Sequence, residues 1–113
     1  MSITELAKLR QVTSETLRYY DRIGLITPDY VDPQTRYRYY SIRQYEKLGT
    51  IKELRQLGMS IHDITDYFSG RNLRKSHQLL LHQLELLEEE IRKQQLLSEI
   101  LRRKLHFLSE ITP

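Results

Sequence analysis

The C-terminal third of the chain carries a heptad stripe, in which apolar residues recur at alternating spacings of four and three. Eight of its eleven positions are apolar, and the stripe runs through Leu73, His77, Leu80, Leu84, Leu87, Ile91, Gln94, Ser98, Leu101, Leu105 and Leu108. Such a stripe predicts a coiled-coil helix. At about 1.5 Å per residue this helix extends roughly 50 Å, too far to be buried against the compact part before it. Self-association is therefore expected.

Dimerisation contacts are predicted at the apolar stripe positions Leu80, Leu84, Leu87, Ile91, Leu101, Leu105 and Leu108. A second apolar line, at Leu97, Ile100, Phe107 and Ile111, widens this face and indicates that the helix also packs on something besides one partner helix. Gln94 and Ser98 interrupt the stripe near its middle, and polar residues in a seam can specify register at a cost in stability. The sequence leaves the direction of pairing open.

The residues before this helix have a different composition. Residues 1–75 hold 13 Lys and Arg against 9 Asp and Glu, whereas residues 76–113 hold 5 against 6. Seven of the eight tyrosines lie between Tyr19 and Tyr45. A formal net charge of +3 suits a nucleic-acid partner but does not establish one. The shift in composition predicts a compact basic domain, residues 1–70, and a helical tail, residues 71–113.

Three short segments begin with a serine that is followed three residues later by an acid or an amide, at Ser2, Ser41 and Ser60. In such a capping box the serine hydroxyl accepts from the third backbone N–H, and the third side chain reaches back. The pattern predicts helices over residues 3–10, 41–57 and 60–69. A further helix begins at residue 13 or 14, runs to residue 23 and ends at Gly24 in the left-handed conformation. Buried positions are expected at Ile3, Leu6 and Ala7 in the first helix and at Ile61, Ile64, Tyr67 and Phe68 in the last.

Gly49 lies inside the predicted helix 41–57, where glycine costs about 1 kcal/mol relative to alanine. Close packing is therefore expected at this position. The first two helices, joined by a tight turn, have the spacing of a helix-turn-helix. Residues 25–40 contain Pro28 and Pro33, and a turn signal at residues 32–35 lies between two β-prone pairs, which predicts a hairpin wing. The expected fold is mainly α: a winged helix-turn-helix domain with a small β-hairpin, followed by a long C-terminal coiled-coil helix.

Three motifs in this arrangement resemble those of a known family. Residues 16–25, TLRYYDRIGL, resemble the recognition-helix signature of MerR-family transcription regulators. Residues 37–41, YRYYS, and 51–60, IKELRQLGMS, are similar to the family's next two motifs, in the same order. The wing stretch PDYVDP, residues 28–33, is especially similar to the multidrug-sensing branch. The resemblance covers residues 2–69.

Two positions depart from the family pattern. Gln11 stands where the turn usually carries glycine, so the bend is expected to use a different backbone geometry. Arg36 stands where the wing often carries glycine, which adds a charge at a tip expected to lie near DNA.

The resemblance implies DNA contacts from the recognition helix. Arg18 is the main candidate for reaching base edges or adjacent phosphates, and Tyr19 and Tyr20 are candidates for donating hydroxyl hydrogen bonds to phosphate. Because adjacent helix residues point about 100° apart, core packing is the alternative for one of the two tyrosines. For Thr16 and Ser14, DNA contact and hydrogen bonding at the helix start are equally open.

The wing and the third motif supply the other candidates. Arg36, Tyr37 and Arg38 interleave basic and aromatic side chains at the hairpin, and the family match makes Arg38 a phosphate contact. Lys52, carried over from the third motif, is either a contact to the DNA backbone or part of a solvated helix face.

The expected function is a homodimeric regulator that binds an inverted-repeat promoter operator. The resemblance implies that its helices pair antiparallel and that the dimer bends and untwists the promoter so that RNA polymerase can engage it. The choice between activator and repressor stays open. In the multidrug branch a ligand-binding domain follows the dimerisation helix, so this chain is expected to be a fragment of an effector-responsive regulator. The alternative explanation of the short chain is that it is a short member of the family that does not depend on a ligand.

A different class of function is a coiled-coil protein-interaction module with a winged-helix adaptor domain, although such an adaptor has no need of a basic, tyrosine-rich surface. Catalysis and cofactors are not expected, because the sequence holds no phosphate-binding glycine loop and no credible nucleophile–base pair. The chain has no cysteine and its four histidines lack ligand spacing, so no metal site is expected. No apolar run or leader predicts a membrane location, which makes a cytoplasmic protein the expectation.

Overall fold

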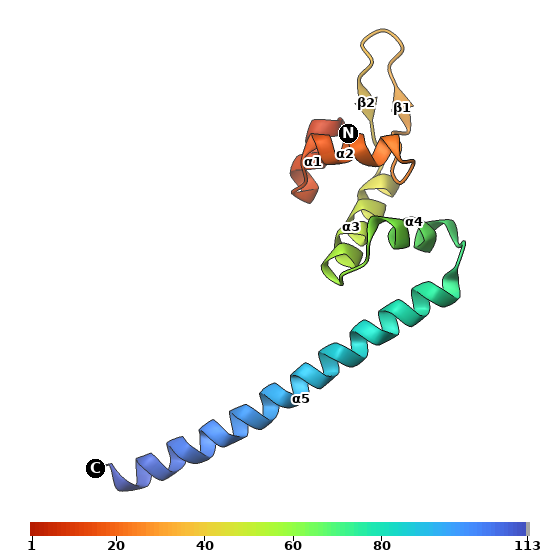
Figure 1. The fold of residues 1–113 in the computed structure, drawn as a ribbon. Coiled ribbons are helices and arrows are strands. Elements are labelled where there is room, and N and C mark those ends of the chain that lie inside the picture. Colours follow the sequence, from red (N-terminus) through yellow and green to blue (C-terminus); the bar gives the residue numbers. More distant parts are fainter. Residues whose placement is uncertain (113) are drawn as a thin grey trace. The chain divides into compact units, whose positions relative to one another are not determined.

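The computed structural model describes residues 1–112, and within them the chain forms five helices and one β-hairpin (Figure 1). In chain order these are α1 (Ile3–Arg10), α2 (Ser14–Arg22), β1 (Tyr30–Val31), β2 (Arg38–Tyr39), α3 (Ile42–Gln56), α4 (Ile61–Ser69) and α5 (Leu73–Ile111). The predicted fold class is confirmed. The chain divides into two compact units. We call the first, Met1–Arg71, the head; the second begins at Asn72 and holds α5. Pro113, the end of the predicted tail, lies outside the described residues.

The helix starts of the head follow the serine pattern. The Ser2 hydroxyl accepts from the Glu5 amide at 3.1 Å, and the Glu5 carboxylate accepts from the Ser2 amide at 3.2 Å, which lowers the pKa of Glu5. The Ser60 hydroxyl accepts from the Asp63 amide at 3.1 Å. At Ser41 the contact runs through Gln44, whose Oε1 accepts from both the amide and the hydroxyl of Ser41. These bonds satisfy donors that every helix leaves open at its first turn.

The core of the head is small and aliphatic. α1 packs on α2 and α3, and α3 packs on α4. The fully buried side chains are Leu6, Leu17, Leu25, Ile26, Leu48, Ile51 and Ile64. Four positions expected inside, Ile3, Ile61, Tyr67 and Phe68, are only half-buried. They lie at the edge of the core. There the rings of Phe68 and Tyr67 pack edge to face, with their centres 5.2 Å apart, and the Lys47 ammonium lies 4.8 Å from the Phe68 ring.

The turn between α1 and α2 keeps a left-handed residue although it lacks a glycine. Gln11 has φ 56° and ψ 48°, which is the conformation glycine adopts most readily. Its amide bonds back to the carbonyls of Ala7 and Lys8. The expectation of a changed backbone geometry at the bend is therefore wrong, because Gln11 takes the left-handed conformation itself.

Gly49 is closely packed, as its place inside a helix predicted, and the group over it is the side chain of Arg10 at the end of α1. A Cβ atom at Gly49 would lie 2.6 Å from the Arg10 guanidinium. That guanidinium is held in place, because its Nε donates to the Tyr45 carbonyl at 2.9 Å and it stacks 3.7 Å from the centre of the Tyr45 ring. These two contacts of Arg10 attach the end of α1 to α3.

The wing is a two-stranded antiparallel hairpin in which Tyr30 pairs with Tyr39 and Val31 with Arg38. Asp32 organises its turn: the carboxylate accepts from the amides of Gln34 at 2.8 Å and Thr35 at 3.1 Å, and these bonds lower the pKa of Asp32. At the hairpin base an isolated bridge joins Ser2 to Tyr39, so the chain start is tied to the wing.

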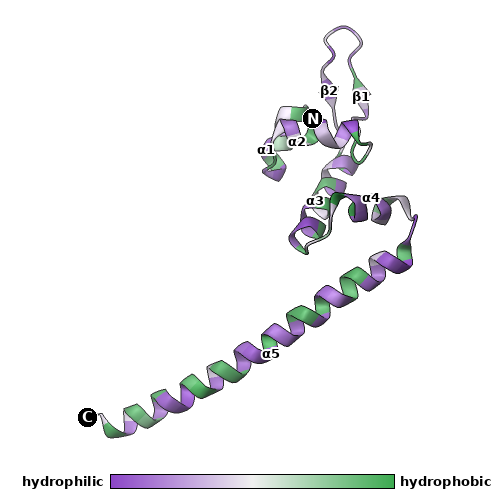
Figure 2. Cartoon of the chain, viewed as in Figure 1, coloured by the Kyte–Doolittle hydropathy of each residue, from purple (hydrophilic) through white to green (hydrophobic). Residues whose placement is uncertain are grey.

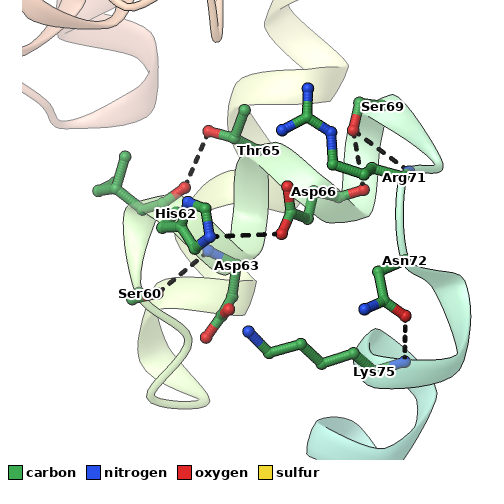
Figure 3. A network of polar contacts seen from close by, with 10 residues as sticks. Ser60, His62, Asp63, Thr65, Asp66, Ser69, Arg71, Asn72 and Lys75 are labelled. Carbon is green, nitrogen blue, oxygen red and sulfur yellow. Dashed lines mark hydrogen bonds and ion pairs between the residues drawn. The ribbon is translucent and has the colours of Figure 1, made fainter.

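α4 ends in a short polar network (Figure 3). Asp66 is 8% exposed and lies 3.5 Å from the imidazole of His62, one helical turn away. The Ser69 hydroxyl donates to the Asp66 carbonyl at 3.2 Å and accepts from the Arg71 amide at 3.3 Å. Gly70 then closes the helix with φ 69°. The hydrophobic pattern gave no sign that Asp66 would be buried.

The second unit is a single helix, α5, of 39 residues. Its start is capped by the Asn72 side chain, which accepts from the Lys75 amide at 3.2 Å (Figure 3). Figure 2 shows apolar and polar residues alternating along its whole length. Among the predicted dimerisation residues Leu80 is half-buried, while Leu84, Leu87, Ile91, Leu101, Leu105 and Leu108 are 51–64% exposed. None of the helices described has the length and apolar character needed to cross a membrane.

Candidate nucleic-acid interface

α2 has one buried face and one open face. Leu17 and Tyr20 point into the core, whereas Arg18 and Tyr19 are exposed. The open face borders a shallow hollow lined by Thr13, Glu15, Thr16, Arg18, Tyr19 and Arg22. The helix therefore presents a mixed face of cations, hydroxyls and one carboxylate to an incoming ligand.

The two adjacent tyrosines divide between core and surface, as the step of about 100° between neighbouring helix residues allows. Tyr20 is 9% exposed, and burial raises the pKa of its hydroxyl. It takes the core role that the sequence left open for one of the pair. Tyr19 is 42% exposed, and the Arg22 guanidinium lies 5.7 Å from its ring centre. Of these two tyrosines, only Tyr19 has an exposed side chain.

Hydroxyl groups at the start of α2 form hydrogen bonds within the helix start. The Thr13 hydroxyl oxygen caps the helix by accepting from the Thr16 amide at 3.0 Å, and the two threonine hydroxyls are 2.8 Å apart. Thr16 therefore hydrogen bonds at the helix start, one of its two expected roles. Ser14 is half-buried at the first position of the helix.

An ion pair joins the recognition helix to the wing. Arg38 on β2 donates through Nε to the Asp21 carboxylate at 3.1 Å, and both side chains are partly buried. A second hollow is lined by Arg18 and Arg38 together with Tyr37, and by Ser2, Ile3 and Thr4 at the start of α1. Candidates that are 19 or 20 positions apart in sequence thus share one concave surface.

A buried tyrosine that senses the charges of Asp21, Arg38 and Arg18 was not predicted from the sequence. Tyr40 is 2% exposed, and its hydroxyl has no hydrogen-bond partner among the described residues. Burial raises the pKa of Tyr40, the Asp21 carboxylate raises it further, and Arg38 and Arg18 act in the opposite sense. The only sequence signal is its place at the end of the wing motif YRYYS.

The remaining candidates have contrasting surroundings. Arg36 is exposed at the wing turn with φ 64°, so it too occupies a left-handed position that favours glycine. Tyr37 is 65% exposed. Lys52, by contrast, is half-buried and its ammonium donates to the Arg10 carbonyl. It caps the end of α1, a role that neither interpretation of Lys52 included, so it is not simply a solvated residue.

Within residues 1–112, no group of three or more His, Asp or Glu side chains could hold a metal ion. The open polar surface instead combines cations with hydroxyl donors on α2 and the wing. This is the chemistry that phosphate oxygens and base edges recognise.

The family of the chain follows from a model for the MerR HTH family regulatory protein, which matches residues 1–71. The chain belongs to the MerR family. The multidrug-efflux transporter 1 regulator of Bacillus subtilis (strain 168) is 36% identical to this chain over 110 residues, which are 97% of this chain and 34% of the relative. The transcriptional regulator BrlR of Pseudomonas aeruginosa is 36% identical over 104 residues, which are 88% of this chain and 38% of the relative.

A solved structure of a protein–DNA complex is also similar to this chain. The cryo-EM structure of the EcmrR–DNA complex in EcmrR-RPo is similar to 97% of this chain with a TM-score of 0.65 and 32% identity, and the match spans 39% of that chain. The predicted resemblance to the multidrug branch is confirmed by the multidrug-efflux transporter 1 regulator. Both relatives are named as regulators. This chain spans little more than a third of the length of the curated relatives it matches.

Proposed function

We propose that this chain is the DNA-binding and dimerising part of a transcription regulator, and that a homodimer binds an inverted-repeat promoter operator. The observation that carries the proposal is the shared surface of α2 and the wing, where Arg18, Tyr37 and Arg38 line one hollow. The similar EcmrR structure is a complex with DNA, which supports the same ligand class here.

Within this proposal five of the candidates contact DNA, each in its own way. Arg18 reaches base edges or an adjacent phosphate from the open face of α2. Tyr19 donates its hydroxyl to a phosphate, and Arg38 and Arg36 contact phosphates from the wing. Tyr37, which is exposed at the same wing, adds a further hydroxyl donor. Phosphate contacts fix the position of such a domain, and base contacts give it sequence preference.

The dimer follows from the exposed stripe of α5. An inverted repeat has twofold symmetry, so two identical heads joined by their helices match its two half-sites. The family resemblance adds antiparallel pairing, bending and untwisting of the promoter, and RNA polymerase as a further partner. Smooth bending of a site costs on the order of 1–6 kcal/mol, which contacts from two wings can offset. An effector domain outside this chain is the proposed source of ligand control.

Fluorescence anisotropy with an inverted repeat selected from a random library tests the proposal. The control is a scrambled duplex of the same composition, and both are titrated at 50 and 200 mM salt. Six to ten phosphate contacts predict a loss of roughly 10³–10⁵ in affinity between these concentrations, with the selected repeat bound more tightly throughout. Equal, weak binding of both duplexes would contradict the regulator and favour a protein-interaction module.

A further inference from the structure

The exposed stripe of α5 is flanked by charges in a particular order. In heptad lettering that starts with His77 as a, the stripe occupies positions a and d, and positions e and g border it. The charged bordering residues are Glu88 and Arg102 at e, and Glu90 and Lys104 at g. All four side chains are exposed. Residues at these positions choose partner and orientation in coiled coils because they face each other across the seam.

Parallel pairing leaves these charges unused. In a parallel pair each g residue faces the e residue five positions later on the other helix. Glu90 then faces Gln95, Lys104 faces Ser109, and Arg102 faces Leu97. No opposite charges meet across the seam.

Antiparallel pairing brings e opposite e and g opposite g, because the two helices then share each edge of the seam. The registers that keep a against d differ by whole heptads. In the register centred on Leu96, Glu88 faces Arg102 of the second copy and Glu90 faces Lys104 of the second copy. Twofold symmetry repeats both contacts, which gives four pairs of opposite charge.

The neighbouring registers lose these pairs. A shift by one heptad in either direction places all four charged residues opposite uncharged ones, such as Gln95 or Leu97. A shift by two heptads places like charges together, either Glu88 against its own copy or Arg102 against its own copy. Charge alone therefore favours one register.

The polar interruptions of the stripe favour the same register independently. When the pairing is centred on Leu96, Gln94 lies in one layer with Ser98 of the second copy, on both sides of the centre. A one-heptad shift would place Gln94 against Ile91 or Leu105 instead, and burying an amide without a partner is unfavourable. In α5 the Gln94 Nε2 donates to Glu90 at 3.1 Å, so its Oε1 is left to accept from the Ser98 hydroxyl.

We propose that α5 binds α5 of a second copy in one antiparallel register, centred on Leu96 and selected by the pairs Glu88–Arg102 and Glu90–Lys104. This inference rests on the proposed antiparallel dimer and adds its register and the residues that set it. Leucine and isoleucine layers then flank the polar centre symmetrically, with Ile91 against Leu101 and Leu87 against Leu105.

Distances between spin labels test the register directly. The chain has no cysteine, so a single introduced cysteine carries the label. Four outward-facing f positions are used, in the variants His82→Cys, Glu89→Cys, Leu96→Cys and Arg103→Cys. The axial separation between the two labels of a dimer is twice the offset from residue 96, or about 42, 21, 0 and 21 Å at 1.5 Å per residue. The lateral separation is the same at all four sites.

Double electron–electron resonance is expected to give a profile with its minimum at residue 96 and equal distances at residues 89 and 103. A distance that does not change with position would show parallel pairing and overturn the inference. Unequal distances at residues 89 and 103 would show another register and overturn it while leaving the dimer in place. Absence of any coupling would contradict the proposed dimer itself.

A charge exchange tests the four selecting residues. Glu88→Arg with Glu90→Lys places like charges opposite each other and is expected to weaken self-association roughly 30-fold at low salt. Adding Arg102→Glu and Lys104→Glu restores opposite charges in the same register, so association is expected to return to within about threefold of the original. Sedimentation equilibrium measures both. If the variant with all four substitutions does not regain its self-association, these pairs do not select the register.

Discussion

Leucine has opposite surroundings in the two units of this protein. In the head, Leu17 and Leu48 are completely buried, whereas Leu101 and Leu105 of α5 are 63% and 64% exposed. Burying one leucine side chain contributes about 1.5–3 kcal/mol. The head gains this energy within a single chain, but α5 can gain it only by associating with something else. The head therefore buries its apolar side chains within one chain, whereas the apolar stripe of α5 needs a second surface to cover it.

This difference predicts two kinds of stability. Unfolding of the head should not depend on protein concentration, because its core is intramolecular. The melting of α5 should rise with concentration, because association stabilises the folded helix by mass action.

Charges placed in the stripe should separate the dimer. Leu84→Asp with Leu87→Asp would bury unpaired carboxylates in two layers of each copy, so self-association should weaken by at least roughly 10³-fold. Sedimentation velocity should then show monomers whose heads remain folded. Leu96→Asp, on the outer face of α5, is the control and should leave the dimer intact. Dimers that persist in the double variant would show that the interface lies elsewhere.

A cavity in the head should destabilise the head without affecting association. Leu48 is fully buried on α3, and Leu48→Ala should lower the free energy of unfolding by about 3 kcal/mol. Thermal unfolding followed by near-ultraviolet dichroism of the head tyrosines measures this loss. Leu9→Ala removes a leucine that is 61% exposed on α1 and should change stability by less than about 0.5 kcal/mol. Equal losses in both variants would contradict the described core.

Removal of the main base-contact candidate should affect DNA preference and nothing else. Arg18→Ala should cost about 2 kcal/mol of discrimination between the selected operator and a scrambled duplex. The dimer should remain, since Arg18 lies on the head. Arg103→Ala, which removes the same charge from α5, is the matched control in the anisotropy titration. An unchanged footprint on the operator would show that Arg18 does not contact the DNA.

The ion pair between α2 and the wing gives the smallest and most specific effect. Asp21→Asn removes a negative charge near the proposed DNA surface, which by itself should tighten binding. If Asp21 instead orients the Arg38 guanidinium for a phosphate, affinity should fall about threefold, a cost typical of one partly exposed pair. In an Arg38→Ala background the same change should be neutral or favourable. Tighter binding in both backgrounds would show that Asp21 does not position Arg38.

Local signals in the sequence predicted the elements well. The caps at Ser2 and Ser60 and the left-handed Gly24 depend on atoms within a few residues of each other, so a short stretch of sequence contains all the partners. The heptad stripe is likewise a local regularity, and it predicted α5 as one helix. The backbone conformation at Gln11 and Arg36 was harder to predict. The sequence shows that a glycine is missing there, but not that the backbone keeps the left-handed conformation.

The candidate interface was predicted as a set of residues but not as an arrangement. Helical periodicity left core packing open for one of Tyr19 and Tyr20, and the choice depended on where α1 and α3 lie. The bond of Lys52 to the end of α1 joins residues 42 positions apart, and the pair between Arg38 and Asp21 joins residues 17 positions apart. No pattern of neighbours along the chain contains such contacts.

The sequence by itself therefore determined the helices, the wing, the family and the face on which α5 is apolar, because hydrogen-bonded caps and hydrophobic periods act over one or two turns. The tertiary structure decided which tyrosine is buried, where the Arg10 guanidinium sits against Gly49, and which cations share a surface with Tyr37. These outcomes depend on packing between distant segments, where the space left by one side chain determines the position of another.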